Sequence, residues 1–388
     1  MVRDHGDGVM AIVGRIGMVG SIALNLAALV IYLRGSFFWS ISTATKKQVL
    51  VSRYGRADGE LLLHAPVLSE EDHMKFVSYA YDIYDNVIFC IGDPTMFETF
   101  WRGPISENAT LVIPGWQTMS YFSDIRNLCW FLEPILECDV RRLHRLVGNA
   151  AAEGYHVLVG TGSMQLFQAA LYALAPPTAD MPVSVVSLTP LYLSYPLVTD
   201  FLNSGLYRWA GDANTFDGDD YIEWALVKDK EVAQKMNKFM ELNTIGVSKD
   251  AKLRAAKILG LIVDGYEHQL TTPASGDVNL LFHFARREMV YRWRALRAAV
   301  ATSGIFSLPD KVVGFCTFTK DTVSAHPSFA WLCCEKEEVE DLESFLREHK
   351  IITRSGNKFG ADRKVVRISM VDINEAFNIF INRLAAMK

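Results

Sequence analysis

The sequence predicts an α/β protein with a parallel sheet, followed by a smaller α/β unit at the C-terminal end. Two observations carry this prediction. Apolar strands alternate with amphipathic helices between residues 86 and 190, and this alternation favours a parallel sheet. After a long helix near residue 290, a second strand and helix series begins. The length of 388 residues is enough for two or three domains.

The N-terminal part contains an uncharged hydrophobic stretch. Residues 16–33 read IGMVGSIALNLAALVIYL and lie between Arg15 and Arg34. As a helix they would be about 27 Å long, close to the hydrocarbon thickness of a bilayer. A signal peptide is the alternative, although its apolar core is usually shorter and no convincing cleavage site follows. We expect residues 1–45 to form a membrane anchor, with the endoplasmic reticulum as its membrane. Because basic residues follow the stretch, we expect the body to lie in the cytosol.

Composition excludes several classes of protein. The net charge of −5 does not favour nucleic acid as a partner, and no zinc-finger spacing occurs. The six cysteines are scattered without a CxxC pair, so we expect reduced thiols. The nine histidines form no metal-binding pattern, and we predict no metal site.

The elements of the first half follow from hydrophobic periodicity. NVIFCIGDPT (86–95) predicts a strand that enters a turn, and ECDVRRLHRLVGNA (137–150) predicts a helix. YHVLVGTGS (155–163) predicts a buried strand, and MQLFQAALYAL (164–174) a helix with one apolar face. That face comprises Leu166, Ala170, Ala173 and Leu174. PVSVVSLTP (182–190) predicts a second buried strand.

The second half contains longer helices. WALVKDKEVAQKMNKFMEL (224–242) predicts a strand and a helix, and residues 280–301 predict another helix. Strands are predicted at SFAWLCCE (328–335) and VVRISMV (365–371), and helices at 337–349 and 372–387. Asp372 and Glu375 resemble a capping box at the last helix. We therefore predict a large domain over residues 46–275 and a small domain over residues 276–388.

Three short patterns suggest binding chemistry. Gly160-Thr161-Gly162-Ser163 lies between a strand and a helix, where free N–H groups suit a phosphate, although such a turn is often only a turn. Tyr192 follows the next strand, at the edge where ligands bind in open α/β sheets, and it is equally compatible with a packing role. Arg367 lies in an apolar strand and therefore needs an anionic partner, either a ligand carboxylate or an internal carboxylate.

These patterns together resemble the plant alliinase and tryptophan aminotransferase-related family, within the fold-type I pyridoxal-phosphate enzymes of aspartate aminotransferase-like fold. The stretches that carry the resemblance extend from about Ile88 to the C-terminus and include GDPTMFETFW, MSYFSDIRNLCWFLEP, VGTGSMQLFQAALYAL, WALVKDKEVAQKMNKFMELN, IITRSGNKFG and VVRISM. The cysteine-rich module of true alliinases is absent, so the chain is more similar to the tryptophan aminotransferases of auxin synthesis.

The resemblance implies roles for five residues. The backbone of Ser163 and Met164 would hold the phosphate of pyridoxal 5′-phosphate, and Tyr121 would reach the phosphate of a partner subunit's cofactor in a homodimer. Tyr192 would stack on the pyridine ring, and Arg367 would bind the substrate carboxylate. The family usually has a threonine at the position of Met164, so a hydroxyl contact would be lost.

The sequence departs from the family at Glu223–Trp224. The family has further strands between YIE and WALV, whereas here the two are joined directly. About sixty to seventy residues are absent, and with them the Schiff-base lysine, which the cofactor chemistry needs, and the aspartate that pairs with the ring nitrogen. No catalytic lysine is therefore assigned. Lys228 and Lys230 lie in a charged turn, where lysines are usually solvated.

The sequence supports three functional hypotheses. The first is an aminotransferase that moves the amino group of an amino acid, expected to be L-tryptophan, to a 2-oxo acid and forms indole-3-pyruvate. The second is a carbon–sulfur lyase that acts on alkylcysteine sulfoxides. The third is a non-catalytic, membrane-anchored remnant. Because the two strands at the junction run in opposite directions in the family, we also expect uncovered sheet edges and apolar helix faces in the large domain.

Overall fold

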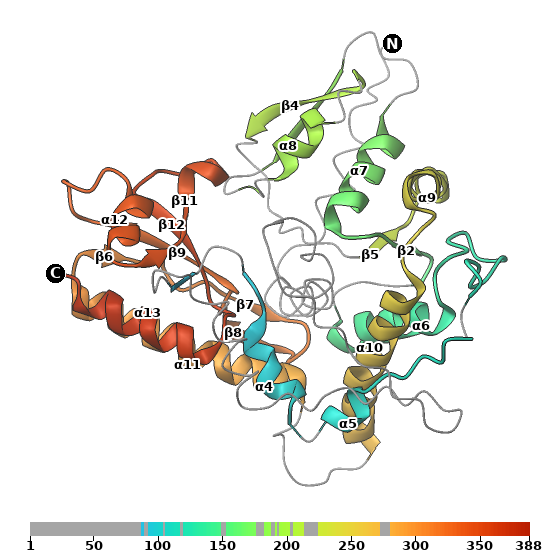
Figure 1. Ribbon diagram of the computed structural model, residues 1–388, viewed down its shortest axis with the longest axis horizontal. Helices are drawn as coiled ribbons and strands as arrows, with labels where there is room; N and C mark the ends of the chain where they lie inside the picture. Colours follow the sequence, from blue (N-terminus) through green and yellow to red (C-terminus); the bar gives the residue numbers. More distant parts are fainter. Residues whose placement is uncertain are drawn as a thin grey trace, which may run out of the picture.

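A computed structural model describes residues 87–88, 92–103, 105–116, 119–148, 153–175, 182–187, 191, 194–201, 205–212, 224–271 and 280–388. The predicted anchor at residues 16–33 lies outside these residues, as do Tyr192 and Glu223. Among the helices that are described, none is both long and apolar enough to cross a bilayer. Figure 1 shows the arrangement of the elements.

The first group of elements surrounds a strand pair. Strands β2 (His156–Val159) and β5 (Trp224–Val227) run antiparallel, as expected for the WALV segment. Helices α7 (Ser163–Leu174) and α9 (Lys230–Thr244) pack together beside the pair, and α6 (Pro134–Val147) packs against α10 (Lys249–Thr271) (Figure 1). Val157 and Leu158 are buried beside these helices, and on α6 the side chains of Val140, Leu143 and Val147 are buried.

The second group is a parallel strand pair that is poorly covered. Strand β3 (Val183–Ser187) pairs with β4 (Tyr207–Asp212), and α8 (Ser194–Phe201) follows β3. Within the described residues these two strands form a sheet of their own. The prediction of a buried strand is wrong here, because Val183 and Val186 are 43% and 51% exposed. No described strand covers β3 on its side away from β4.

The C-terminal group contains a four-stranded antiparallel sheet. Its order is β11 (Arg354–Ser355), β12 (Val365–Ser369), β9 (Phe329–Cys334) and β6 (Phe306–Ser307). Helices α11 (Leu281–Ser303) and α13 (Asn374–Ala386) pack together along it (Figure 1). Strand β9 occurs where a strand is predicted, and its burial alternates, since Ala330 and Leu332 are fully buried while Phe329 and Trp331 are partly exposed.

Shorter elements connect the groups. Strand β1 (Val87–Ile88) pairs in parallel with β10 (Ile351–Ile352), and η2 (Thr95–Phe97), α4 (Glu98–Trp101) and α5 (Ser106–Ala109) follow it. The hairpin of β7 (Val313–Cys316) and β8 (Asp321–Ser324) reaches α6, where Thr317 donates to the carbonyl of Val147 at 2.7 Å. Helix α12 (Leu342–Glu348) and η4 (Gly356–Phe359) complete the C-terminal part.

Three local predictions need correction. Helix α12 begins at Leu342 because Asp341 caps it, accepting from the amide of Ser344. Helix α13 has no side-chain cap, and Asp372 is buried instead of capping it. On α7, Leu166 and Ala173 are buried as predicted, but Leu174 is 45% exposed.

Candidate functional site

The turn between β2 and α7, which we call the cradle, is the candidate site for a phosphate group. Gly162 has φ of 131°, which side-chain-bearing residues rarely adopt, and no side chain caps the helix. A Cβ atom on Gly160 would lie 2.8 Å from Leu166, so glycine lets the strand approach the helix closely. The amides of Ser163 and Met164 therefore lie in the first turn of a helix of 12 residues, where partial positive charge gathers. This part of the geometry suits an anionic group.

One amide of the turn is already engaged. The backbone N–H of Thr161 donates to Gln165 Oε1 at 2.6 Å. Gln165 is buried, and its Nε2 donates to Asn243 and Thr244 at 3.0 Å each. This network fixes the turn against the end of α9. The cradle is therefore built in advance, with the amides of residues 162–164 available for an anion.

The described residues near the cradle include no lysine suited to form a Schiff base with pyridoxal phosphate. The register places Trp224 opposite Val159, at the cradle end of the strand pair, and Val227 opposite His156, at the far end. Lys228 and Lys230 follow Val227 and are exposed, so they lie away from the cradle. The cradle fits the phosphate group of the cofactor, whereas no described lysine lies where it could bind the cofactor covalently. No reaction step through the cofactor follows from these residues.

The buried Lys252 has another role. Lys252 on α10 is 3% exposed, and its ammonium donates to the carbonyl of Phe131 and lies 5.8 Å from the centre of that ring. Burial lowers its pKa. These contacts tie α10 to the segment of residues 119–133.

Arg367 is held between two aromatic rings. Its guanidinium carbon lies 4.2 Å from the ring centre of Phe329 and 4.6 Å from that of Phe359. The side chain is 8% exposed, and in the sheet Arg367 is the cross-strand neighbour of Trp331. Cation–π contacts of this kind stabilise a guanidinium at both faces and leave its edge for hydrogen bonds. We call Arg367, Phe329 and Phe359 together the candidate receptor.

Two other segments meet this receptor. The amide of Leu191 donates to the carbonyl of Phe359 at 3.1 Å, so the chain after β3 reaches the ring beside Arg367. Gly92 has φ of 78°, and a Cβ atom there would lie 2.6 Å from Phe329. Leu191, the neighbour of Tyr192, therefore contacts Phe359, which packs on Arg367. Tyr192 itself lies outside the described residues.

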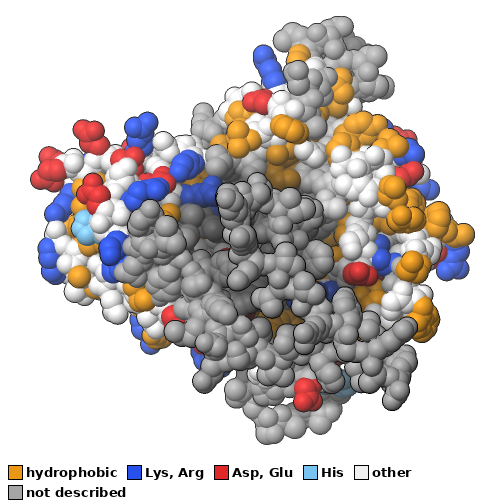
Figure 2. Space-filling view, in the orientation of Figure 1, with side chains coloured by type: hydrophobic (Ala, Val, Ile, Leu, Met, Phe, Trp, Pro, Cys, Tyr) orange, Lys and Arg blue, Asp and Glu red, His pale blue; other side chains and the backbone are white. Residues whose placement is uncertain are grey.

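Tyr121 lies on a segment that is fixed at its ends and apolar at its surface. Lys249 donates to the carbonyls of Ser120 and Phe122 at 3.2 and 3.0 Å, and Ser123 donates to Glu133 at 2.6 Å. The exposed hydrophobic side chains here are Val112, Trp116, Met119, Tyr121, Phe122, Ile125 and Ile135. Figure 2 shows hydrophobic side chains gathered on the right-hand side, where Figure 1 places α6, α7 and α9. Nothing described brings Tyr121 to the cradle of its own subunit.

A buried polar network supports the receptor sheet. Arg292 on α11 is fully buried, donates to the carbonyl of Met370 at 2.9 Å and to Asn374 at 2.7 Å, and lies 4.7 Å from the Phe377 ring centre. Burial lowers the pKa of its guanidinium to about 10. Burial, with a smaller contribution from Asp93, raises the pKa of Asp372 to about 7. These residues join α11, α13 and the end of β12.

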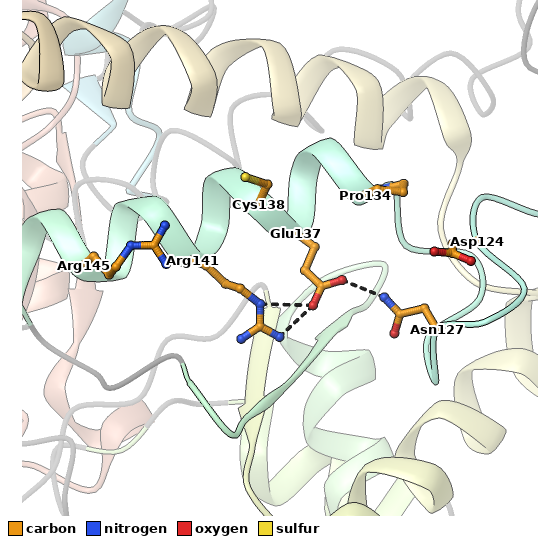
Figure 3. Close-up of a pocket in the computed structure, with 7 residues that line it drawn as sticks. All are labelled: Asp124, Asn127, Pro134, Glu137, Cys138, Arg141 and Arg145. Atoms are coloured by element: carbon orange, nitrogen blue, oxygen red, sulfur yellow. Dashed lines mark hydrogen bonds and ion pairs between the residues drawn. The ribbon is translucent and has the colours of Figure 1, made fainter.

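A surface hollow lies elsewhere, beside α6. It has a volume of about 310 Å³ and is lined by Asp124, Asn127, Pro134, Glu137, Cys138, Arg141 and Arg145 (Figure 3). Its polar groups satisfy one another, since Glu137 accepts from Asn127 at 2.6 Å and from Arg141 at 2.7 Å. None of the predicted site residues lines this hollow, so we do not assign the site to it.

Sequence reasoning missed part of the receptor. Phe329, Phe359 and Gly92 were assigned no role, although Phe359 lies in IITRSGNKFG and Gly92 in GDPT. Because side chains alternate along a strand, the segment SFAWLCC could have placed Phe329 and Trp331 on one face of the sheet. Trp331 is the cross-strand neighbour of Arg367. No signal in the sequence pairs that strand with VVRIS.

Comparison with solved structures defines the class of fold. An Escherichia coli enzyme with methionine aminotransferase function has a TM-score of 0.50 at 12% identity, covering 84% of this chain and all of that one. The chain therefore has the fold of an aminotransferase, and this part of the predicted fold class is confirmed.

Sequence comparison shows the family. The family described as Allinase matches residues 88–223 and 220–388, and the chain belongs to it. Tryptophan aminotransferase-related protein 1 of Oryza sativa subsp. japonica is 52% identical, over 96% of this chain and 95% of its own length. Alliin lyase of Allium cepa is 26% identical over 76% of this chain and 75% of its own length. The resemblance drawn from the motifs is confirmed.

The same comparisons show an internal discontinuity. The family matches in two segments that meet at residues 220–223. The alignment with the rice protein runs over 441 residues but takes in 96% of 388, or about 370. About 70 aligned positions of the rice protein therefore have no counterpart in this chain.

Proposed function

We propose that this chain derives from a pyridoxal-phosphate-dependent aminotransferase and is catalytically impaired as it stands. The parent activity transfers the amino group of an aromatic amino acid, L-tryptophan, to a 2-oxo acid and yields indole-3-pyruvate, a precursor of auxin. The proposed substrates are supported by the buried Arg367, which lies between Phe329 and Phe359. An arginine in this position suits the carboxylate that amino acids and 2-oxo acids share.

The impairment rests on the position of the discontinuity. We infer that the positions without a counterpart fall at Glu223–Trp224, where the two family segments meet. The register places Trp224 at the cradle end of β5, so the absent block would have stood beside the cradle. The Schiff-base lysine is assigned to that block by resemblance, and none of the described lysines replaces it. The exposed face of β3 supports the same reading, since central strands would cover it.

Two alternatives remain as proposals. Carbon–sulfur lyase activity is less favoured, because the relative named alliin lyase is 26% identical whereas the tryptophan aminotransferase-related protein is 52% identical. A non-catalytic remnant is favoured for the chain as it stands, and the exposed apolar segment around Tyr121 supports pairing with a second subunit. Anchoring through residues 16–33, with the body in the cytosol, is a further proposal, and membrane fractionation of the full chain tests it.

The decisive experiment traps the cofactor. Purified full-length protein is incubated with pyridoxal 5′-phosphate, reduced with borohydride and digested, and pyridoxyl-lysine is sought by mass spectrometry. Formation of indole-3-pyruvate from L-tryptophan is measured in parallel. The rice relative, which is 52% identical, serves as the positive control under the same conditions.

We expect no pyridoxyl-lysine and no turnover in this chain, with both present in the control. A labelled lysine together with turnover would overturn the impairment, and replacement of that lysine by arginine would identify it as catalytic. Turnover of an alkylcysteine sulfoxide would instead favour the lyase. Sequencing the transcript across the codons of residues 223 and 224 tests whether the absent block is encoded.

A further inference from the structure

Strand β3 has one edge that no described strand covers. The amide of Val183 donates to the carbonyl of Leu206 at 2.8 Å, which directs the backbone of Val183 towards β4. Alternate residues of a parallel strand bond to opposite neighbours, so the N–H and C=O groups of Ser184 and Val186 point away from β4. Within the described residues no strand pairs with them on that side, and the side chain of Val186 is 51% exposed.

Strand β4, by contrast, carries the features of a natural sheet edge. Its register with β3 passes from Trp209 to Gly211 between consecutive residues of β3, which makes a bulge, and Gly211 has φ of 97°. Arg208 and Asp212 add charges to the strand. Bulges and charged side chains are the devices by which proteins keep edge strands from pairing with other chains. Strand β4 is therefore built to end the sheet.

Strand β3 has none of these devices. Its residues, VSVVS, carry no charge, and the valines among them favour the interior of a sheet. A strand of this composition pairs readily with another chain when its edge is open. The composition of β3 therefore indicates a strand with a neighbour on both sides, of which only β4 is among the described residues.

The comparisons indicate where the second neighbour belongs. The alignment of 441 residues takes in 96% of 388, so about 70 positions of the rice protein have no counterpart here. The two family segments meet at residues 220–223, after the end of β4 at Asp212 and directly before the start of β5 at Trp224. A strand that follows β4 in a relative can pair with β3 only on the edge that β4 leaves open. The absent block therefore supplies the missing neighbour.

We propose that the open edge of β3 binds, as an added strand, an extended segment from the absent block of a full-length relative. The segment forms backbone hydrogen bonds with Ser184 and Val186 and covers the exposed valines. The proposal rests on the proposed function, because both place the absent block between β4 and β5. It adds that this chain keeps the receiving edge and accepts the block from a second polypeptide.

Binding to the full-length chain tests the proposal. The probe is a soluble carrier protein fused to the segment of the rice relative that has no counterpart here, and the carrier fused to a scrambled segment is its control. Ser184→Pro removes the outward N–H and keeps the bonds to β4, and Val186→Lys places a charge on the edge. Val313→Lys is the matched control, because Val313 is a strand valine of β7 that is 61% exposed. Thermal unfolding of each variant verifies that it folds.

We expect the unmodified chain to bind the fusion and not the scrambled control. Binding should slow hydrogen exchange at the amides of Ser184 and Val186 by about tenfold or more. Ser184→Pro and Val186→Lys should each weaken binding by about tenfold, because each disrupts backbone pairing along the edge. Val313→Lys should change binding by less than about twofold. Equal binding of the scrambled segment, or an equal loss in Val313→Lys and Val186→Lys, would refute β3 as the receiving edge.

Failure of this inference and failure of the proposed function are distinguishable. If the fusion does not bind, the receiving edge is refuted, and the proposed function stands as long as the chain alone forms no pyridoxyl-lysine. If the chain alone forms pyridoxyl-lysine with turnover, the proposed function fails whatever the fusion does. Self-association that Val186→Lys abolishes, without binding of the fusion, would identify a second copy as the occupant and refute the absent block.

Discussion

Replacement of Gly92 by alanine tests whether the turn after β1 supports the aromatic clamp on Arg367. The φ of 78° at Gly92 disfavours any side chain, and a Cβ atom would lie 2.6 Å from Phe329 Cζ. The backbone effect costs about 1 kcal/mol, and overpacking of a fitted ring adds about 1–3 kcal/mol. We therefore expect Gly92→Ala to lower the free energy of unfolding by about 2–4 kcal/mol.

Gly304 provides the matched control for the backbone effect. It has φ of 76° at the end of α11, and a Cβ atom there would meet nothing within 4 Å. Gly304→Ala should therefore cost only the backbone effect, about 1 kcal/mol. The difference between the two variants isolates the collision with Phe329. Urea unfolding followed by tryptophan fluorescence measures both.

A double-mutant cycle sharpens the test. In a Phe329→Leu background the smaller side chain leaves room for the new methyl group, so Gly92→Ala should cost about as much as Gly304→Ala. If Gly92→Ala costs no more than Gly304→Ala in the unmodified chain, the close approach of Gly92 to Phe329 is refuted. The same result would remove the support that we assign to residue 92 in holding Arg367.

Two further predictions concern charge and association. Because the pKa of Asp372 is raised to about 7 in the folded state, its contribution to stability is present below about pH 4 and declines as the pH rises through 7. Asp372→Asn should reduce this decline in urea unfolding measured from pH 4 to pH 8, and an unchanged profile would refute the assignment. Trp116 and Ile125 are each 76% exposed, so Trp116→Ser with Ile125→Ser should shift sedimentation towards monomer. An identical sedimentation profile would argue against this segment as a subunit contact.

Most elements of the fold could be predicted from local patterns. The helices α6, α9, α11 and α13 have strong apolar periodicity, and each occurs where that periodicity places it. The strands β2, β9 and β12 are short apolar runs between turn signals and were also found. Period and turn chemistry act within one segment, so they are visible without knowledge of the partner.

Burial of β3 could not be predicted in the same way. Its apolar residues indicate a covered strand, and they would be covered if neighbouring strands were present. In this chain the described neighbour is β4 alone, and Val183 and Val186 are exposed. Burial of a strand depends on the strand and on the element that covers it, whereas the sequence pattern of the strand describes only the strand itself.

The sequence by itself determined the family, the glycine turn at residues 160–163 and the presence of an arginine that needs an anion. Each of these depends on the chemistry of a few adjacent residues. Only the tertiary structure decided that Phe329, Phe359 and Gly92 surround Arg367 and that Arg354 lies opposite it. Strand register and the packing of distant segments create those contacts, and no local pattern specifies which strand a given strand will pair with.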